Sequence, residues 1–427
     1  MNVGATNYLP RLMDGLIKDL LASFPALALD GPKAVGKTSS AGLVAKTILN
    51  VDDERIRESL VNNPDQLATS AKPVLIDEWQ YHPPIWNRVR RFVDSSAAPG
   101  SYLLTGSAYP AGAQIHSGAG RIIHVRMRPL SIQERLQAVP TVSLADCLNG
   151  APGDISGSTG FTTLNYIHEI VRSGYPAIWS APEKNRARLL DSYIDNIVKK
   201  EFTENGYTVR RSDSLRRWLR AYAAATGTTA SYSSILDAAT PGEGDKLPRA
   251  TMEAYRNMLT NLWLLDETPA WSPIEGSFSR LKQTPKHFLA DPALAARLLD
   301  LDERILGLGG EETCFDAAYG TLAGRLFEAL VGMSLQTYAL VNDAGLGYLG
   351  DRNGEREVDF IVYKGRRIVA IEVKLSPTVE DRDVRHLKWL REKYGKNFME
   401  GIIVTTGIDS YRRKDGILVV PAALLGA

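Results

Sequence analysis

Residues 31–38 read Gly-Pro-Lys-Ala-Val-Gly-Lys-Thr and match the pattern G-x-x-x-x-G-K-[ST] at every fixed position. The apolar run Ala26–Leu29 precedes this stretch and ends in Asp-Gly, as a buried strand does before a turn. We expect Ser39–Ile48 to form the helix that follows. A glycine-rich loop between a strand and a helix presents backbone N–H groups to phosphate, so the stretch predicts a nucleotide-binding α/β domain.

The residue types of this loop suit a bound nucleoside triphosphate. Gly31 and Gly36 permit close approach and unusual backbone dihedrals. Lys37 supplies positive charge for the β- and γ-phosphates, and the Thr38 hydroxyl can ligate Mg²⁺. The predicted nucleotide contacts are Gly31, Pro32, Lys33, Ala34, Val35, Gly36, Lys37, Thr38 and Ser39.

Two further strand ends carry polar residues that suit the same chemistry. The apolar segment Val74–Ile76 ends in Asp77 and Glu78, which predicts Asp77 as a Mg²⁺ ligand and Glu78 as the base that orients the attacking water. A solvated strand end is the alternative, and the P-loop upstream disfavours it. The segment 103–107 places Thr105 or Ser107 where either would sense the γ-phosphate, although a capped turn explains these hydroxyls equally well.

Phosphoryl transfer also calls for a cation near the leaving phosphate. Arg121, Arg126 and Arg128 follow the third strand, and Arg121 is preferred because it comes after Ser-Gly-Ala-Gly. It would act within its own chain or in a neighbouring subunit. For any one of these residues, a surface arginine is the competing interpretation.

Strands and helices alternate through this region, which favours a parallel sheet covered on both faces. Residues 138–163 are rich in Gly, Ser, Pro and Ala and mark a domain edge. Two short helices within 229–264 and a hairpin of strands 265–270 and 287–290 outline a winged helix. An arginine run near Arg216 precedes it and would serve DNA binding, or else a solvated face of a packing module. The predicted domains span residues 1–150, 160–300 and 305–427.

A second group of charged residues lies near the C-terminus. Strands 358–363 and 368–374 joined at a tight hairpin would bring Asp359 near Glu372 and Lys374, which share one face of their strand. Two carboxylates can bind Mg²⁺ for phosphodiester hydrolysis, and Lys374 would either position the attacking water or stabilise the developing charge. Glu328, on the preceding helix 321–338, would add a carboxylate. A surface salt-bridge cluster is the alternative.

The whole-chain properties limit other functions. In 427 residues, 50 Lys plus Arg balance 49 Asp plus Glu, so any nucleic-acid site must be a local patch. Cys147 and Cys314 are the two cysteines and are far apart, which predicts neither a zinc site nor a disulfide framework. No signal-peptide pattern and no apolar run of about 18 residues appears, so we expect a cytoplasmic protein without a membrane partner.

The ordered motifs resemble a broad bacterial and archaeal family of AAA-type ATP-binding proteins whose C-terminal domain has no assigned function and is similar to PD-(D/E)xK nucleases. The matching stretches span most of the chain: GPKAVGKT, VLIDEWQ, LLTGSA, GRIIHVRMRPLSIQE, SGYPAI, PKHFLADPALAARLL, GRLFEALV and EVDF…IEVK. Lys33 is a small departure, because relatives usually carry arginine there.

The resemblance implies an α/β architecture: a P-loop NTPase domain of AAA type with a parallel sheet, a helical and winged-helix middle region, and a C-terminal restriction-endonuclease-like domain. It gives Asp359, Glu372 and Lys374 the nuclease signature and Glu328 its helical acid. We therefore predict a Mg²⁺-dependent ATPase whose nucleotide state controls a nuclease-like domain acting on DNA or RNA. The alternative is an ATP-dependent regulatory or toxin-like switch that binds protein or DNA without cleaving it. ATP is preferred over GTP because no guanine-reading motif is present. A homo-oligomer is compatible with the sequence, which does not decide the oligomeric state.

Overall fold

The computed structural model describes residues 8–95, 97–108, 118–204, 212–240, 248–272, 283–308, 317–350 and 356–427. The chain forms two compact units. The first combines residues 1–128 with the segments 199–210 and 257–264. The second combines residues 129–198, 211–256 and 265–427. The chain therefore passes between the units repeatedly, and short segments of the middle region belong to the first unit.

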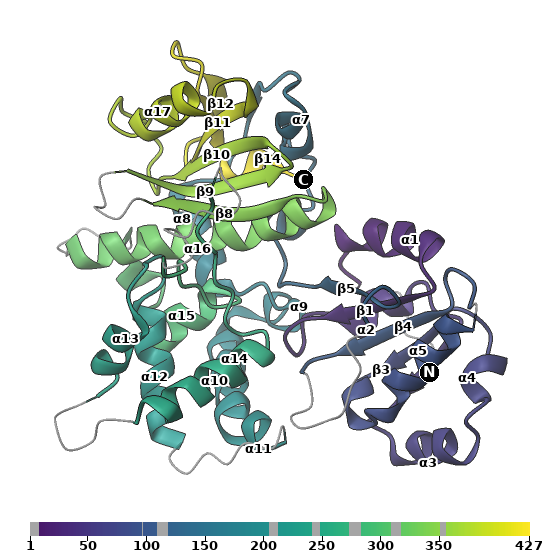
Figure 1. Ribbon diagram of the computed structural model, residues 1–427. Helices are drawn as coiled ribbons and strands as arrows, with labels where there is room; N and C mark the ends of the chain where they lie inside the picture. The colour runs from purple at the N-terminus through teal and green to yellow at the C-terminus, as the bar shows by residue number, and fades with distance from the viewer. Residues whose placement is uncertain are drawn as a thin grey trace. The chain divides into compact units, whose positions relative to one another are not determined.

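The first unit is built on a five-stranded sheet in the order β2-β3-β4-β1-β5, with every neighbouring pair parallel (Figure 1). Parallel pairing confirms the expected α/β sheet, and it places the carboxyl ends of the strands along one edge. The strands are β1 Ala26–Asp30, β2 Thr47–Asn50, β3 Val74–Asp77, β4 Tyr102–Gly106 and β5 Ile123–Arg126.

Helices cover both faces of this sheet. Alternate residues of β1, β3 and β4 pack with α3 (Glu54–Asn62), α4 (Gln66–Thr69) and α5 (Pro84–Asp94) around a core that contains Trp79 and Trp86. On the other face, α1 (Met13–Ser23) contacts β1 and α2 (Lys37–Gly42) (Figure 1). Burial on both faces explains why these strands are continuous apolar runs rather than alternating ones.

The expected helix over Ser39–Ile48 is wrong beyond Gly42, where α2 ends. The N–H groups of Lys46 and Thr47 both donate to the Pro73 carbonyl, at 2.9 and 3.3 Å, and the chain continues as β2 beside β3. Tertiary pairing therefore overrides the local apolar pattern. Strand β5 was not expected, although its sequence, Ile-His-Val-Arg, alternates as a half-buried strand does.

The second unit contains a seven-stranded mixed sheet in the order β7-β12-β13-β11-β10-β9-β8. β10, β11 and β13 run parallel, whereas β8, β9 and β12 pair antiparallel with their neighbours. The expected tight hairpin is present, with Lys364 opposite Arg367. The strands are β7 Gly157–Ser158, β8 Gly345–Gly350, β9 Glu357–Lys364, β10 Arg367–Val373, β11 Phe398–Thr405, β12 Asp409–Arg412 and β13 Leu418–Pro421.

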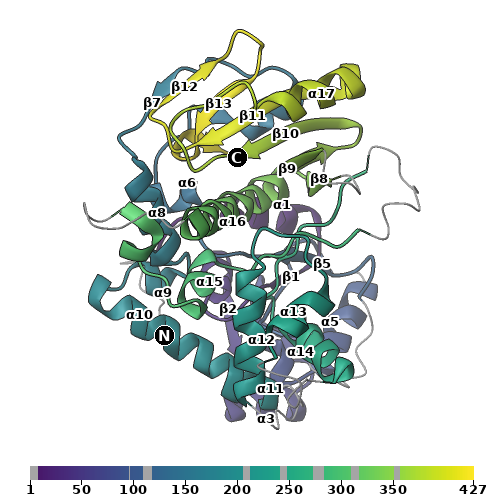
Figure 2. The ribbon, with the colours of Figure 1, turned by 90° about the vertical axis from the view of Figure 1, so that its left-hand side faces the viewer.

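Long helices flank this mixed sheet. Helix α16 (Ala317–Val341) contacts β8, β9 and β10, and Gly332 on it permits the close approach of the Phe360 ring. Helix α17 (Arg385–Tyr394) contacts β9, β10 and β11 (Figure 2). A separate two-stranded pairing joins β6 (Val142–Ser143) to β14 (Leu425–Gly426).

The remaining helices precede or follow these elements along the chain. They are α6 Ile132–Leu136, α7 Leu144–Asn149, α8 Thr163–Arg172, α9 Pro176–Trp179, α10 Glu183–Asn196, α11 Phe202–Glu204, α12 Ser212–Ala224, α13 Tyr232–Ala238, α14 Arg249–Asn261 and α15 Pro292–Leu298. After α14, antiparallel bridges join Leu265 to Leu289 and Thr268 to Lys286. The winged-helix assignment stays a prediction.

The structure bears on the expectations about membrane spans and cysteines. Within the described ranges, no helix is both long enough and apolar enough to cross a membrane. Cys147 is buried and free, and Cys314 lies outside the described residues.

Candidate nucleotide-binding site

The loop between β1 and α2 requires its glycines for steric reasons. Gly31 has φ 149°, and a Cβ there would lie 2.3 Å from the Met127 carbonyl oxygen. Gly36 (φ 104°) and Ala34 (φ 65°) also adopt positive φ, a region that side chains disfavour. These positive φ angles make the backbone curl tightly, as it does in a phosphate-binding loop.

Lys37 lies inside this curl. Its side chain is buried, and Nζ donates to the carbonyl oxygens of Gly31 (2.8 Å) and Pro32 (2.9 Å). Burial lowers the pKa of Lys37 to about 8, although nearby Glu78, Asp30 and Asp77 oppose the change. The ammonium thus bridges the loop at the position from which it would reach phosphate oxygens.

Arg11, just before α1, holds the loop from outside the motif. Its guanidinium is buried and donates to the carbonyl oxygens of Val35 (2.9 Å) and Arg128 (2.7 Å). Both acceptors are backbone atoms from distant parts of the chain. The sequence analysis missed this residue, because nothing in its local pattern distinguishes it from a surface arginine.

Asp77 lies beside the threonine of the P-loop. The Thr38 hydroxyl donates to Asp77 Oδ1 at 2.7 Å, and the Thr105 hydroxyl donates to the same oxygen. The second contact follows from the parallel register, which places Asp77 opposite Thr105. A hydroxyl and a carboxylate in contact below a phosphate loop are the oxygen donors that Mg²⁺ favours, so these residues fit that ion.

Glu78 follows Asp77 in a left-handed conformation, with φ 54°. Its carboxylate accepts hydrogen bonds from the Gln80 side-chain amide and, at 3.3 Å, from the Ser107 hydroxyl. Gln80 Nε2 also contacts Ser107 Oγ at 3.2 Å. The structure therefore brings Glu78 and Ser107 together as expected, and it adds Gln80. The spacing of Gln80 two residues after Glu78 was the signal that could have drawn attention to it.

The other loop residues lie around this centre. Val35 is buried, Ser39 is half-buried, and Lys33 is half-exposed, with Nζ 2.7 Å from Glu201 Oε1. Glu201 belongs to the segment 199–210 of the same compact unit. Lys33 therefore connects the P-loop to that segment.

Arg121 is not near its own P-loop. Strand β5 runs parallel to β1, with Ile123 beside Leu27, so Arg121 lies at the edge where β1 begins. Its Nε pairs with Asp94 Oδ1 at 2.6 Å, at the end of α5. The P-loop follows the opposite end of β1. The intrachain role predicted for Arg121 therefore finds no support in this geometry.

The C-terminal carboxylates gather around a lysine that the sequence analysis did not select. Lys286 is buried, and its Nζ lies 2.8 Å from Glu328, 2.9 Å from Glu357 and 3.0 Å from Asp359. Asp359 also accepts the Val373 N–H at 2.9 Å. The predicted proximity of Asp359 to strand β10 is therefore present, and Lys286 lies among the carboxylates.

Glu372 and Lys374 lie near each other, but their ion pair is longer than those of Lys286. Lys374 Nζ lies 4.0 Å from Glu372 Oε2, and His386 Nδ1 lies 3.8 Å from Glu372 Oε1. Burial, followed by the nearby Asp359, raises the pKa of Glu372 well above its usual range. Burial also raises the pKa of Glu328 to about 8. Burial therefore favours the protonated forms of Glu328 and Glu372.

Mg²⁺ does not fit this cluster as it stands. An ammonium already contacts one oxygen of each of three carboxylates, and the second Asp359 oxygen accepts the Val373 N–H, so a divalent ion would compete with the ammonium for these groups. Among the described residues, no group of three or more His, Cys, Asp and Glu side chains is arranged to hold a metal. The metal-ligand roles predicted for Glu328, Asp359 and Glu372 stay predictions that this arrangement disfavours.

The arginines of the middle region are partly paired. Arg216 contacts Asp195 and Arg220 contacts Asp300, each at 2.6 Å, while residues 210 and 211 lie outside the described residues. These contacts reduce the positive charge available to a polyanion. The DNA-binding interpretation of this run stays a prediction.

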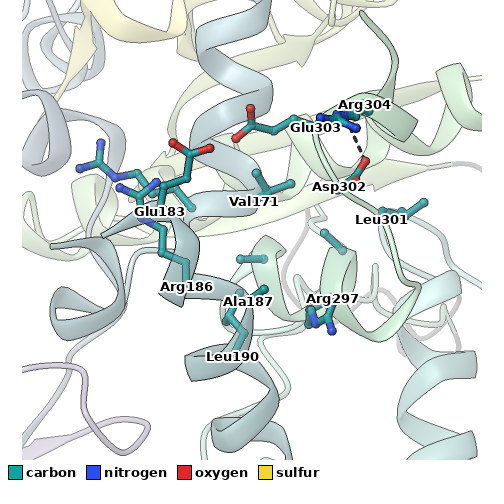
Figure 3. Close-up of a pocket in the computed structure, with 13 residues that line it drawn as sticks. Val171, Glu183, Arg186, Ala187, Leu190, Arg297, Leu301, Asp302, Glu303 and Arg304 are labelled. Atoms are coloured by element: carbon teal, nitrogen blue, oxygen red, sulfur yellow. Dashed lines mark hydrogen bonds between the residues drawn. The ribbon is translucent and has the colours of Figure 1, made fainter. Parts of the chain in front are cut away.

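A cavity of about 280 Å³ lies within the second unit, between α8, α10 and α15 (Figure 3). Its apolar lining includes Leu190 and Leu301. Its rim mixes arginines with acidic side chains, including Arg186, Glu183 and Glu303. This mixture of charges does not define a ligand class.

Comparison with known proteins agrees with the geometry of the first unit. The sequence model of a family described as an AAA domain matches residues 23–136, the range that contains β1, the P-loop and β3 to β5. Two families described as domains of unknown function, DUF8612 and DUF4143, match residues 163–305 and 323–425. The chain therefore carries an AAA-type P-loop domain, followed by two regions whose families have no assigned function.

Similar whole proteins add little detail. The uncharacterized proteins Rv2008c of Mycobacterium tuberculosis and Mb2031c of Mycobacterium bovis are each 24% identical over 294 residues, 66% of this chain. The matched part spans 57% of the length of these relatives.

Two solved structures show a distant likeness. The Walker-type ATPase PABY2304 of Pyrococcus abyssi has a TM-score of 0.40 and 14% identity, with 69% of this chain and 97% of that one covered. The Aeropyrum pernix ORC2 protein, solved as ADPNP–ADP complexes, has a TM-score of 0.34 and 16% identity, with 69% and 95% covered. Such low scores do not establish a shared fold over the whole chain.

Proposed function

We propose that this protein binds ATP with Mg²⁺ and hydrolyses it at the P-loop of its first unit. The main observation behind this proposal is the contact between Thr38 and Asp77 beside the curled loop, with Glu78 next in sequence. These groups come from α2 and β3, and the parallel sheet brings them to one edge. The AAA domain match to residues 23–136 supports the same proposal.

Each residue has a distinct task in this proposal. The loop backbone and Lys37 bind the β- and γ-phosphates, for which Lys37 exchanges its two carbonyl acceptors for phosphate oxygens. Thr38 and Asp77 would hold Mg²⁺, which when bound neutralises phosphate charge.

Glu78 orients the attacking water and accepts its proton. Gln80 and Ser107 both contact the Glu78 carboxylate and fix its direction, so Ser107 links this group to the end of β4. These two hydrogen bonds orient the carboxylate, and a general base acts only when it lies within hydrogen-bond reach of the proton that it accepts.

Substitution of Glu78 by Gln tests this assignment. It preserves shape and removes the base, so phosphate release from ATP should fall at least a hundredfold while affinity for a fluorescent ATP analogue changes less than threefold, consistent with the usual contribution of general bases. GTP competition in the same binding assay tests the preference for adenine. Equal turnover by the variant and the wild type would contradict the role of Glu78.

Nucleic-acid cleavage is not part of this proposal. The nuclease hypothesis requires Mg²⁺ at Asp359 and Glu372, and Lys286 engages Asp359 instead. Three ideas remain predictions: binding of DNA or RNA through the middle region, an ATP-dependent switch, and a homo-oligomer that supplies an arginine. No contact among the described residues favours one of them.

A further inference from the structure

The C-terminal carboxylate cluster contains a cation supplied by the chain itself. We infer that Lys286 is its resident cation: the ammonium takes the place of a divalent metal, and the two compete for Glu328 and Asp359. This inference concerns the second unit and does not depend on ATP hydrolysis in the first.

The number of carboxylates around Lys286 equals the number of N–H donors on its ammonium group. An ammonium has three N–H donors, and Lys286 Nζ has three carboxylate neighbours, Glu328, Glu357 and Asp359, at 2.8–3.0 Å. The Lys286 side chain is only 1% exposed, so water does not compete for these donors. Each contact has the length of a charge-assisted hydrogen bond.

A metal cannot share this arrangement. Asp359 directs one oxygen to Lys286 and the other to the Val373 N–H, so both of its oxygens are already engaged. Mg²⁺ would require oxygens at about 2.0–2.1 Å, and it would repel an ammonium bound to the same groups. The cluster can therefore accept a divalent ion only when Lys286 leaves.

The backbone around Lys286 shows what holds it in place. Lys286 and Thr268 exchange two backbone hydrogen bonds of 2.9 Å. The next residue, His287, donates its N–H to the Thr228 carbonyl, and its ring contacts the Ala230 carbonyl at 2.8 Å. Residues 228 and 230 connect α12 to α13. The backbone that carries Lys286 is therefore hydrogen-bonded to the segment between α12 and α13.

Mn²⁺ binding to the nucleotide-free full chain tests this inference. We compare the wild type with Lys286→Met, with the double variant Lys286→Met/Asp359→Asn, and with Lys364→Met as a matched control. Lys364 lies on β9 of the same sheet but contacts only the Asn342 carbonyl among the interactions described for it. Titration calorimetry or Mn²⁺ electron paramagnetic resonance reports the binding.

We expect Lys286→Met to gain one Mn²⁺ site at least tenfold tighter than any site in the wild type, and to lose it when Asp359→Asn is added. Lys364→Met should behave as the wild type. An equally tight site in the wild type that is lost in the single variant Asp359→Asn, measured in the same way, would overturn the inference, and so would a folded Lys286→Met that binds no additional Mn²⁺.

A second variant covers the case in which Lys286→Met does not fold. Lys286→Met/Glu357→Gln removes one carboxylate together with the ammonium and retains Glu328, Asp359 and Glu372. Its melting temperature should rise with Mn²⁺, whereas that of the wild type should not. The absence of any Mn²⁺ effect on this variant would overturn the inference.

Discussion

Two glycines of the first unit, Gly31 and Gly42, differ in the space around their α-carbons. An added Cβ at Gly31 would lie 2.3 Å from the Met127 carbonyl oxygen, whereas Gly42 has nothing within 4 Å of the same position. Gly31 also has φ 149°, and Gly42 ends helix α2. Alanine substitutions at the two positions therefore distinguish a steric requirement for glycine in the phosphate loop from the general effect of replacing any glycine by alanine.

Gly31→Ala should weaken ATP binding at least tenfold, because the loop must shift away from Met127. Its stability should fall by about 1–3 kcal/mol, the usual cost of such strain. Gly42→Ala should leave ATP binding unchanged and leave stability unchanged or higher by about 0.5–1 kcal/mol. ATP titration and thermal unfolding of both variants measure these effects. Equal losses in the two variants would contradict the account of the loop.

Arg11 and Lys286 show which residues of a site are hard to find in a sequence. The P-loop and the pair Asp77 and Glu78 are local patterns, so their residue types and spacing reveal them. Arg11 and Lys286 act through contacts with residues more than twenty positions away. Their importance arises from packing, and a lone basic residue carries no local sign of it.

At the scale of elements, a buried ion-pair network joins α6 to α8. Arg135 is buried and donates to the Glu169 carbonyl oxygen at 2.6 Å and to its carboxylate at 3.3 Å. Arg172 donates to the other carboxylate oxygen at 3.0 Å. Burial alone would raise the pKa of Glu169, but Arg135 and Arg172 together lower it. The charged form of Glu169 therefore stabilises the folded second unit.

Glu169→Gln should destabilise the second unit by about 3–5 kcal/mol at pH 7, because it leaves Arg135 without its counter-charge. A lowered pKa in the folded state contributes stability above the ordinary pKa of glutamate, and this contribution is lost as pH falls through the lowered value. The difference in melting temperature between wild type and variant should therefore shrink from pH 7 to pH 4 and below.

Glu253→Gln is the control for this experiment, because Glu253 is exposed and pairs only with Arg249 among its described ion pairs. It should change stability by about 0–1 kcal/mol at either pH. A Glu169→Gln difference that stays constant or grows toward low pH would contradict the assigned pKa direction.

Strands that are buried on both faces were predictable from the sequence. Element ends that depend on hydrogen bonds to another strand were less predictable. β1, β3 and β4 are apolar runs and were expected within two residues of their observed ends. A strand was also expected at residues 49–51, close to β2, but the end of α2 was not, because the hydrogen bonds that start β2 go to the Pro73 carbonyl, in the segment before β3. The hairpin of β9 and β10 was expected from the turn sequence around Gly365, and in the structure Gly365 has φ 60°.

At the scale of the whole molecule, the first unit needs chain segments that lie far along the sequence. Segment 199–210 contains Phe202, and segment 257–264 contains Leu259 and Leu262, all buried. Glu201 also pairs with Lys33 of the P-loop. The domain boundary predicted at residue 150 would remove both segments.

A fragment of residues 1–150 should therefore be less stable than the same unit in the full chain. Each large apolar side chain lost from burial contributes about 1.5–3 kcal/mol. We expect a lower melting temperature and weaker ATP binding than in the full chain, and at least partial recovery in a fragment of residues 1–264, which retains both segments. A 1–150 fragment with the stability and ATP affinity of the full chain would show that the segments are dispensable.

ATP hydrolysis by the first unit is the central claim. Its most direct test is phosphate release from ATP by the purified full chain, with Mg²⁺ or with EDTA, beside Lys37→Ala prepared in the same way. The account predicts Mg²⁺-dependent release by the wild type and at least a hundredfold less from Lys37→Ala, because the loss of a charged phosphate contact and of the Lys37 bonds across the loop impairs binding and catalysis together. Release that is equal in the two proteins, or independent of Mg²⁺, would contradict it.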